Sequence, residues 1–281
     1  MSLKSMIVFL DDGESAPLRL NFACRLAKHH GAHLTALALS QQIFPFAAAG
    51  IDAGAASIDV GQMEEARQRA ERVADDAKAA MQASGLPADA RWCCRELSGI
   101  RDVAGIQGRF SELTIVGQPV KGHHMNLREW ALEGALFHSG RPLLLVPDAI
   151  EAAENMRHII VAWDASKEAA RALGDAAPFI AGAEKVSIVI VDPKPDQQEF
   201  GDEPGADIAP ILARHCSNVV VDRIPSSGGT IAEALLERST DAAGSLIVMG
   251  GYGHSRLRET IFGGVTRDMI QQTTLPLLLS H

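Results

Sequence analysis

The sequence predicts an α/β fold of two tandem domains, each a doubly wound, mainly parallel β-sheet with helices on both faces. Three observations lead to this prediction. The chain repeats itself halfway along its 281 residues. Its apolar runs are rich in Val, Ile and Leu without strict alternation, as in strands buried on both faces of a parallel sheet. Alanine-rich helical stretches separate these runs. We place the domains at residues 1–150 and 151–281, joined by a linker within Pro147–Arg157.

Both halves begin with the same pattern: an apolar strand that ends in aspartate, a small polar turn and an alanine-rich helix. Asp11 ends this strand in the first half, and Asp164 ends it in the second. We then expect a second strand, a strand that ends in glycine, and a last strand introduced by proline. These strands are "HLTALAL", "ELTIVG" and "GRPLLLVP" in the first half, and "KVSIVIVDP", "SLIVMG" and "TLPLLLS" in the second.

The middle of each half differs. In the first half, Gln62–Ser84 has the apolar spacing of a long helix, and Pro45–Ser57 is predicted to be a flexible loop. In the second half, the shorter Asp207–Cys216 takes the place of the long helix. Cys93 and Cys94 fall in a predicted strand, so their side chains point to opposite faces and do not suit a shared metal ion.

The composition predicts a soluble, cytoplasmic protein. Four scattered cysteines do not make a disulfide framework, which fits a reducing compartment. No segment is apolar enough to cross a bilayer, and the start of the chain lacks a cleavage-site pattern. The net charge of -9 argues against nucleic acid as the main partner. His29, His30 and His33 have no carboxylate or cysteine at ligand spacing, so we expect no metal; His29 and His30 instead end the first helix, with Gly31 as its stop.

A glycine-rich stretch near the end of the chain is the main candidate site. In a doubly wound sheet, ligands bind beyond the carboxyl ends of the strands, where the strand order reverses. Asp164 and the glycine loop would share that crevice, because each follows a strand. Glycines let the backbone approach a ligand closely, and the start of a helix offers unpaired amides to an anion. Asp164 can accept ribose hydroxyls, and Asp11 and Asp164 can both cap the helices that follow them. The glycines concerned are Gly250, Gly251, Gly253, Gly263 and Gly264.

Several catalytic signatures are missing from the sequence. It contains no P-loop, and the turns after Asp11 and Asp164 lack the dinucleotide-binding glycine pattern. It also contains no nucleophile elbow and no metalloprotease motif. We therefore predict no catalytic residue and no metal site.

The spacing Gly250-x2-Gly253-x9-Gly263, followed by a small residue, resembles the ATP-binding signature of the universal stress protein (UspA) family. The turn from Trp163 to Ser166 also resembles that family's first turn, and the resemblance covers nearly the whole chain as two tandem copies. It implies two five-stranded, Rossmann-like domains of the adenine nucleotide alpha hydrolase-like type and bound ATP or AMP, with or without Mg²⁺. It further implies that the adenine and ribose would meet Asp164 and the backbone of Ala162 and Ile190. The nucleotide-binding residues implied in this way are Ala162, Trp163, Asp164, Ile190, Met249, Gly250, Tyr252, Gly253, Gly263, Gly264, Val265 and Thr266.

Two departures from the signature matter. Gly264 stands where the family has Ser or Thr, which removes a hydroxyl but keeps the amide, and Thr266 is one candidate to supply a hydroxyl instead. In the first half, counting back from Pro142 places Glu129 and Trp130 where the glycine pair would stand, and these side chains would repel and block a phosphate. We therefore expect one competent site, in the second half, with a degenerate and structural first half.

The function expected from these observations is a stress-response or regulatory module that binds an adenine nucleotide and hydrolyses ATP slowly at most, because no general base or P-loop lysine accompanies the phosphates. Two alternatives stay open: a nucleotide-free scaffold for protein interactions and a slow ATPase. The last apolar strand of each half could pair the two domains within one chain or two chains in a homodimer. We expect neither nucleic acid nor membrane as a partner.

Overall fold

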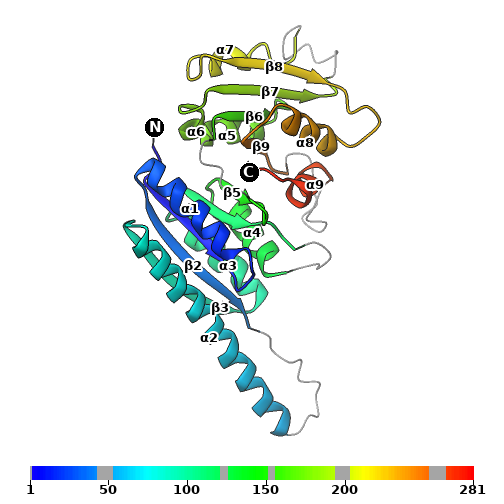
Figure 1. Ribbon diagram of the computed structural model, residues 1–281. Helices are drawn as coiled ribbons and strands as arrows, with labels where there is room; N and C mark the ends of the chain where they lie inside the picture. The colour runs from blue at the N-terminus through cyan, green and yellow to red at the C-terminus, as the bar shows by residue number, and fades with distance from the viewer. Residues whose placement is uncertain (1, 43–52, 121–125, 151–155, 194–202, 253–263) are drawn as a thin grey trace. The chain divides into compact units, whose positions relative to one another are not determined.

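The computed structural model describes residues 2–42, 53–120, 126–150, 156–193, 203–252 and 264–281. The chain divides into two compact units, Ser2–Leu143 and Leu144–His281, and each unit is described by itself. The domain boundary between residues 150 and 151 stays a prediction. The architecture is the predicted α/β fold with parallel strands and interleaved helices (Figure 1).

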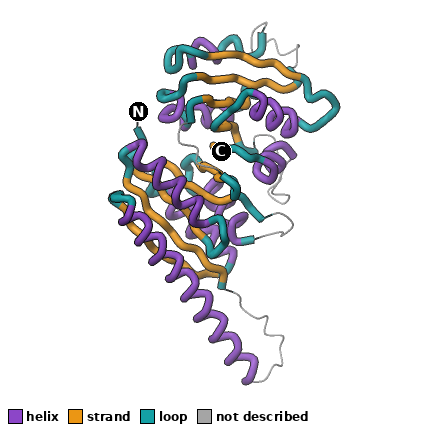
Figure 2. Tube along the Cα trace, in the orientation of Figure 1, coloured by secondary structure: helices purple, strands orange, loops and turns teal. Residues whose placement is uncertain are grey.

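In the first unit, strands and helices alternate along the chain (Figure 2). The sheet order is β3-β2-β1-β4, and the pairs β1–β2, β1–β4 and β2–β3 are parallel. β1 therefore lies between β2, the next strand in the chain, and β4, the fourth strand. The elements are β1 (Ser5–Leu10), α1 (Ala16–His30), β2 (His33–Gln41), α2 (Ala53–Ala83), β3 (Ala88–Arg95), α3 (Leu97–Gly108), β4 (Leu113–Gly117) and α4 (Leu127–His138), with β5 (Leu143–Val146) spanning the boundary between the units.

Local sequence explains where α1 begins and ends. Pro17 stands in its first turn, where the missing N–H costs nothing. Lys28 lies in its last turn, where its positive charge complements the helix dipole, and His29 and His30 end the helix. Gly31 then takes the left-handed conformation, with φ 63°, and ends the helix as predicted.

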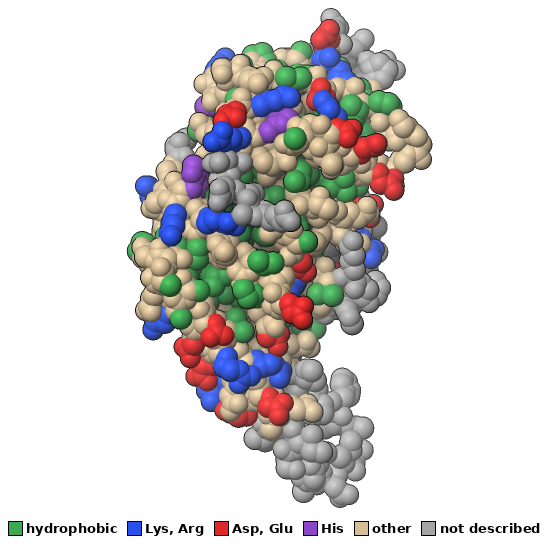
Figure 3. Space-filling view, in the orientation of Figure 1, with side chains coloured by type: hydrophobic (Ala, Val, Ile, Leu, Met, Phe, Trp, Pro, Cys, Tyr) green, Lys and Arg blue, Asp and Glu red, His purple; other side chains and the backbone are tan. Residues whose placement is uncertain are grey.

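The first unit differs from the sequence prediction at α2. This helix begins at Ala53, so the expected loop at Pro45–Ser57 is wrong from Ala53 onward, while residues 45–52 lie outside the described part of the chain. The alanine-rich run from Ala53 favours helix over loop. Along the described face of α2, Arg67 pairs with Glu64 and Glu71, and Figure 3 shows acidic and basic side chains mixed along this helix. Such a face is a solvated surface.

The helices α3 and α4 pack closely against each other on one face of the first sheet. Glycines make this contact close: a Cβ on Gly134 would lie 2.1 Å from the carbonyl oxygen of Arg101, and one on Gly105 would lie 2.6 Å from the Cβ of His138. The helices α1 and α2 contact each other elsewhere in the unit. This arrangement holds the start of α4 near the carboxyl ends of β1 and β4, as the contacts of Arg128 show below.

In the second unit, the sheet order is β10-β9-β6-β7-β8, and every recorded pair in it is parallel. The unit repeats the strand–helix alternation of the first, with a short α7 where the first unit has the long α2. The elements are β6 (His158–Ala162), α5 (Lys167–Asp175), α6 (Ala177–Ile180), β7 (Lys185–Val191), α7 (Ile208–Leu212), β8 (Val219–Ile224), α8 (Ile231–Asp241), β9 (Leu246–Gly250), α9 (Gly264–Gln272) and β10 (Leu277–Ser280).

The core of each unit is its central strands. Val8, Ile115, Ile160, Val248 and Leu278 are at most 1% exposed. Such near-complete burial on neighbouring strands explains the apolar runs without alternation, because helices cover both faces of the sheet. No helix in the described ranges combines the length and apolarity needed to cross a bilayer.

Candidate functional site

The second unit has a switch point between β6 and β9. Strand β6 pairs with β7 on one side, where Val161 aligns with Ile188, and with β9 on the other, where Val161 aligns with Val248. The chain leaves β6 toward β7 and returns to the opposite side of β6 at β9. Side chains that follow the carboxyl ends of these two strands therefore lie along one edge of the sheet, which is the usual place for a ligand.

The turn after β6 presents Asp164 at this edge. Asp164 is exposed, and its Oδ1 accepts a hydrogen bond of 3.0 Å from the backbone N–H of Ser166. Ser166, and not Asp164, caps α5, because its hydroxyl accepts from the N–H of Ala169 at 3.1 Å. The expectation that Asp164 caps α5 was therefore wrong, because the N-cap is Ser166. The carboxylate is held by a short turn and faces solvent at the edge of the sheet.

The end of β9 packs against the start of α5. A Cβ on Gly250 would lie 2.5 Å from the backbone N of Ala169 and 2.6 Å from the carbonyl carbon of Glu168. Only glycine fits there, because the obstacle is backbone. The next residue, Gly251, donates its N–H to the carbonyl of Ser280 at 2.8 Å. Gly250 thus brings the β9 exit beside the first turn of α5, the helix that follows Asp164 in the chain.

A hydrogen bond joins the β9 exit to the start of α9. The N–H of Tyr252 donates to Oγ1 of Thr266 at 3.2 Å, and Thr266 is 7% exposed. Thr266 therefore accepts a bond from the chain itself with the hydroxyl that was considered for a phosphate. Gly264 is exposed, and a Cβ there would meet no atom of the described residues within 4 Å. Val265 is half-buried.

The remaining residues named from the sequence fall into two groups. Ile190 and Met249 are each 6% exposed, so their side chains belong to the sheet and only their backbone could meet a ligand. Ala162 and Trp163 are half-buried at the β6 exit, where the N–H of Trp163 donates to the carbonyl of Val189 at 2.9 Å. Gly253 and Gly263 lie outside the described residues.

The carboxyl edge of the second unit holds an unusual backbone feature. Among the described residues, five that are not glycine have a positive φ, and all five are in the second unit. Four of them follow the ends of successive strands, at φ values of 47° to 61°, where a side chain costs steric energy. Strain of this kind gathers at functional sites, where the surrounding fold enforces it. The four are Ala165 after β6, Asp192 after β7, Ser227 after β8 and Tyr252 after β9.

Comparison with known proteins finds a family match in the second half of the chain. Residues 155–281 match the model of the Universal stress protein family. The family assignment covers these residues. The protein Universal stress protein Slr1230 from Synechocystis is 36% identical over 50 residues, which is 18% of this chain and 17% of that protein, so the alignment spans only a small part of that relative.

Solved structures of universal stress proteins extend the likeness of fold to both halves. A universal stress protein from Archaeoglobus fulgidus has a TM-score of 0.71 at 18% identity, over 98% of this chain and 95% of that one. A putative universal stress protein from Pseudomonas aeruginosa has a TM-score of 0.61 at 12% identity, over 99% and 93% of the two chains. At such low identity these likenesses show the α/β fold alone.

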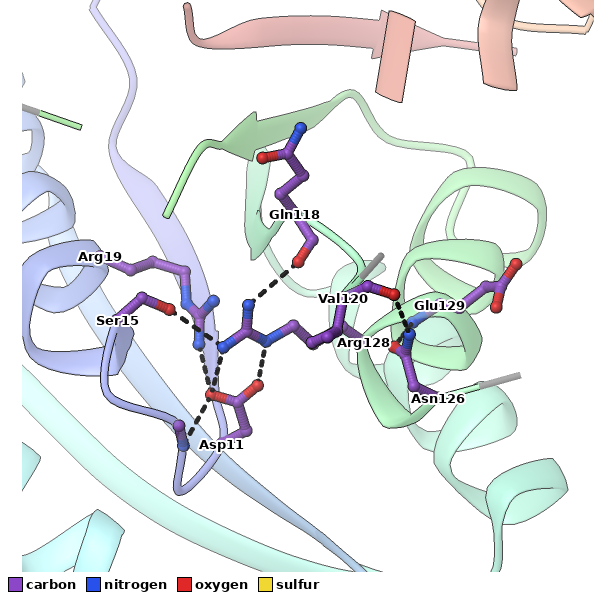
Figure 4. Close-up of polar contacts among 9 residues, drawn as sticks. Asp11, Ser15, Arg19, Gln118, Val120, Asn126, Arg128 and Glu129 are labelled. Carbon is purple, nitrogen blue, oxygen red and sulfur yellow. Dashed lines mark hydrogen bonds and ion pairs between the residues drawn. The ribbon is translucent and has the colours of Figure 1, made fainter. Parts of the chain in front are cut away.

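The edge of the first unit is built differently from that of the second. Asp11, at the end of β1, is 9% exposed, and Figure 4 shows two arginine side chains converging on it. Arg19 of α1 donates from Nη2 to Oδ1 of Asp11 at 2.9 Å. Arg128 of α4 donates from Nε to Oδ2 and from Nη2 to Oδ1 at 3.3 Å. Asp11 does not cap α1, whose N-cap is Ser15.

The two guanidinium groups keep Asp11 ionised. Burial by itself raises the pKa of Asp11, but the charge of Arg19 and the hydrogen bonds and charge of Arg128 together hold this pKa below its ordinary value of 3.8. The carboxylate is thus satisfied within the first unit and is covered by side chains. It has the same place after its strand as Asp164 but a different environment.

Gly117, the glycine at the end of β4, has a packing role. A Cβ on Gly117 would lie 1.5 Å from Nη1 of Arg19, so glycine leaves room for the arginine. Asn126 is the N-cap of α4, and its side-chain oxygen accepts a hydrogen bond from the N–H of Glu129 at 3.1 Å. Glu129 and Trp130 lie in the first turn and a half of this helix, and their effect on a phosphate stays a prediction. Sequence reasoning missed Arg19 and Arg128.

A signal for this cluster existed in the sequence. Arg128 is a cation in the first turn of a helix, where the dipole disfavours positive charge, and such a position suggests a carboxylate partner nearby. The identity of that partner did not follow, because Asp11 lies 117 residues earlier in the chain.

The histidines and cysteines form no metal centre in the part of the chain described, where no group of three or more His, Cys, Asp or Glu could hold an ion. His30 is 9% exposed, and burial together with nearby positive charge lowers its pKa to about 4, so the ring is neutral. Cys93 and Cys94 lie in β3 as predicted, and burial raises the pKa of both thiols. They are therefore poor nucleophiles at neutral pH.

Proposed function

We propose that the second unit binds an adenine nucleotide, ATP or AMP, at the carboxyl ends of β6 and β9, and that the chain serves as a stress-response or regulatory module. The observation that carries this proposal is the placement of Asp164. It is an exposed carboxylate at the switch point of a parallel sheet, on the edge that also holds Gly250. A carboxylate there can accept both hydroxyls of a ribose.

The start of α9 supplies the second part of the proposed site. Gly264 is exposed, and no described residue lies within 4 Å of a Cβ placed there, which leaves the backbone amides of the first turn open to a ligand on the described side. The second half of the chain, from residue 151, carries 11 basic and 18 acidic residues, so a phosphate must be held by these local amides and not by a basic surface. Mg²⁺ would enter, if at all, on the phosphates of ATP.

The strained exits of the strands support the same location. Ala165 and Tyr252 flank the switch point with positive φ, and Tyr252 is also tied to Thr266. Because this edge is already ordered, the protein loses less conformational entropy when a ligand binds there. The first unit shows no such residue among those described.

Titration calorimetry with ATP, AMP and adenosine tests the proposal. We expect ATP and AMP to bind, and adenosine to bind at least about tenfold more weakly, because it lacks the phosphate that the α9 amides would contact. The sharper test is Gly264→Asp against Gly264→Asn. The two side chains have nearly the same size, and aspartate at a helix start favours the helix, so a loss of affinity in the aspartate variant alone reports charge repulsion of phosphate. Equal affinities of the two variants would refute the phosphate contact.

A nucleotide-free scaffold is the second candidate. It is favoured by Gly264, which lacks a hydroxyl, and by Thr266, whose Oγ1 already accepts from Tyr252. The same titration separates the two functions, because a folded chain that binds none of the three ligands supports the scaffold. A slow ATPase would instead show steady turnover that Asp164→Ala abolishes.

A further inference from the structure

Arg128 sits in a nearly complete set of hydrogen-bond acceptors at the edge of the first unit (Figure 4). Its Nε and Nη2 both donate to the carboxylate of Asp11. Its Nη2 also donates to the hydroxyl of Ser15 at 3.0 Å, and its Nη1 donates to the backbone carbonyl of Gln118 at 3.0 Å. These acceptors come from three places in the chain: the end of β1, the turn before α1 and the end of β4. All three nitrogens of the guanidinium therefore donate hydrogen bonds within the first unit.

The chemistry of these acceptors fits a guanidinium group and little else. A carboxylate met by two parallel N–H donors is the geometry that arginine prefers, and a lysine ammonium cannot reproduce it. Carbonyl and hydroxyl oxygens complete the planar set of acceptors around the fork. The side chain of Arg128 is 9% exposed and that of Asp11 is 12% exposed, so water does not compete strongly for these bonds.

The position of this set matters as much as its chemistry. The end of β1 lies between β2 and β4 in the first sheet, so Asp11 stands at the switch point of its unit just as Asp164 does in the second. We propose that the acceptors at the switch point of the first unit, Asp11, Ser15 and the carbonyl of Gln118, form a guanidinium-binding site, and that the chain fills it with its own Arg128. The first unit then carries an internal ligand and takes no nucleotide at Asp11.

Chemical rescue tests this proposal. Arg128→Ala removes the guanidinium group that these acceptors bind. Free guanidinium should then bind in its place. We expect the thermal midpoint of the first unit to be lower in Arg128→Ala and to rise saturably with guanidinium, by about 3 °C at ten times the dissociation constant. The working range is on the order of 1–20 mM, far below the molar concentrations that unfold proteins. Trp130, two residues along α4 from Arg128, is the fluorescent reporter in a background with Trp92→Phe and Trp163→Phe.

Three controls separate site binding from general effects. Urea has nearly the shape of guanidinium but no charge, and sodium chloride matches the ionic strength, so neither should rescue Arg128→Ala. The parent chain with Arg128 present should show no rise. Arg101→Ala is the matched variant, because it also removes an arginine of the first unit. The Cζ atom of Arg101 lies 5.2 Å from the centre of the Trp130 ring, but its side chain is 32% exposed. This variant should be destabilised slightly and should not respond to guanidinium.

The outcomes decide the proposal in both directions. Saturable rescue by guanidinium that urea and salt do not match supports it. Equal responses to guanidinium, urea and salt overturn it, as does an Arg128→Ala chain as stable as the parent. If Arg128→Ala fails to fold, its refolding yield with and without guanidinium replaces the midpoint, and Arg128→Lys gives a second reading. The lysine variant should fold with a lowered midpoint and resist rescue, because its ammonium occupies the site without a fork; a lysine variant as stable as the parent overturns the proposal.

Discussion

Asp11 and Asp164 follow the first strand of their units in the same local pattern, yet they differ in what surrounds them. Asp11 is buried between two arginines, whereas Asp164 is exposed and held by a turn of its own backbone. The arginine that makes the difference comes from the start of α4, more than a hundred residues away from Asp11. The comparison teaches that a repeated strand–aspartate–helix pattern sets where a carboxylate stands, while a distant helix sets what the carboxylate can do.

The largest expected difference between the two edges is in stability. Asp11→Asn leaves two buried guanidiniums without their counter-charge and should lower the free energy of unfolding of the first unit by about 3–5 kcal/mol. Asp164→Asn keeps an oxygen for the N–H of Ser166 and should cost less than about 0.5 kcal/mol. Urea unfolding followed by tryptophan fluorescence measures both. Equal costs would mean that the two carboxylates are not in different environments.

Glycine-to-alanine changes at the β4 and β9 exits should each cost about 1–3 kcal/mol, for different reasons. The added Cβ of Gly117→Ala meets the side chain of Arg19, whereas that of Gly250→Ala meets the backbone of Ala169. A double-mutant cycle separates them. In an Arg19→Ala background, Gly117→Ala should cost little, while Gly250→Ala should keep its full cost. Additive costs for Gly117 and Arg19 would contradict the close contact.

Acid should weaken the first unit in two steps. The folded pKa of His30, about 4, lies below the unfolded value of 6.5, so the unfolded chain binds more protons between these values and stability falls as pH drops from 6.5 to about 4. Asp11 has a folded pKa below 3.8, so its contribution is present above that value and is lost as pH falls further.

Unfolding curves at a series of pH values test these two steps. His30→Gln should flatten the first step and leave the second. Asp11→Asn should flatten only the second step. A lower step that persists unchanged in Asp11→Asn would contradict the assignment of that step to Asp11.

The smallest expected effects are at the helix starts. Asn126→Ala removes the side chain that accepts from the N–H of Glu129 and should cost about 1 kcal/mol. Gly264→Ala adds a methyl group that contacts none of the described residues at the start of α9, and it should stabilise the second unit by up to about 0.8 kcal/mol, since alanine favours helix. Thermal unfolding resolves both changes. A destabilised Gly264→Ala would indicate that the start of α9 is not open.

Much of the fold could be predicted because it depends on neighbours in the chain. The apolar runs marked the strands of both sheets, and the cap at Gly31 marked the end of α1. The prediction failed at Ala53–Ser57, where a run rich in alanine and glycine is compatible with loop or helix and the structure has helix. The exposed placement of Asp164 at the switch point was likewise predictable, because parallel strands end at one edge.

The sequence by itself determined the two-fold repeat, the α/β class, the family of the second half and the position of each aspartate at the end of its strand. Tertiary structure alone decided that Arg19 and Arg128 close the first edge, that Gly250 packs on α5, and that positive φ gathers at the strand exits of the second unit. The physical reason is one of range. Strand and helix patterns depend on residues a few positions apart, whereas an ion pair or a close backbone contact depends on which distant segments the fold brings within a few ångströms.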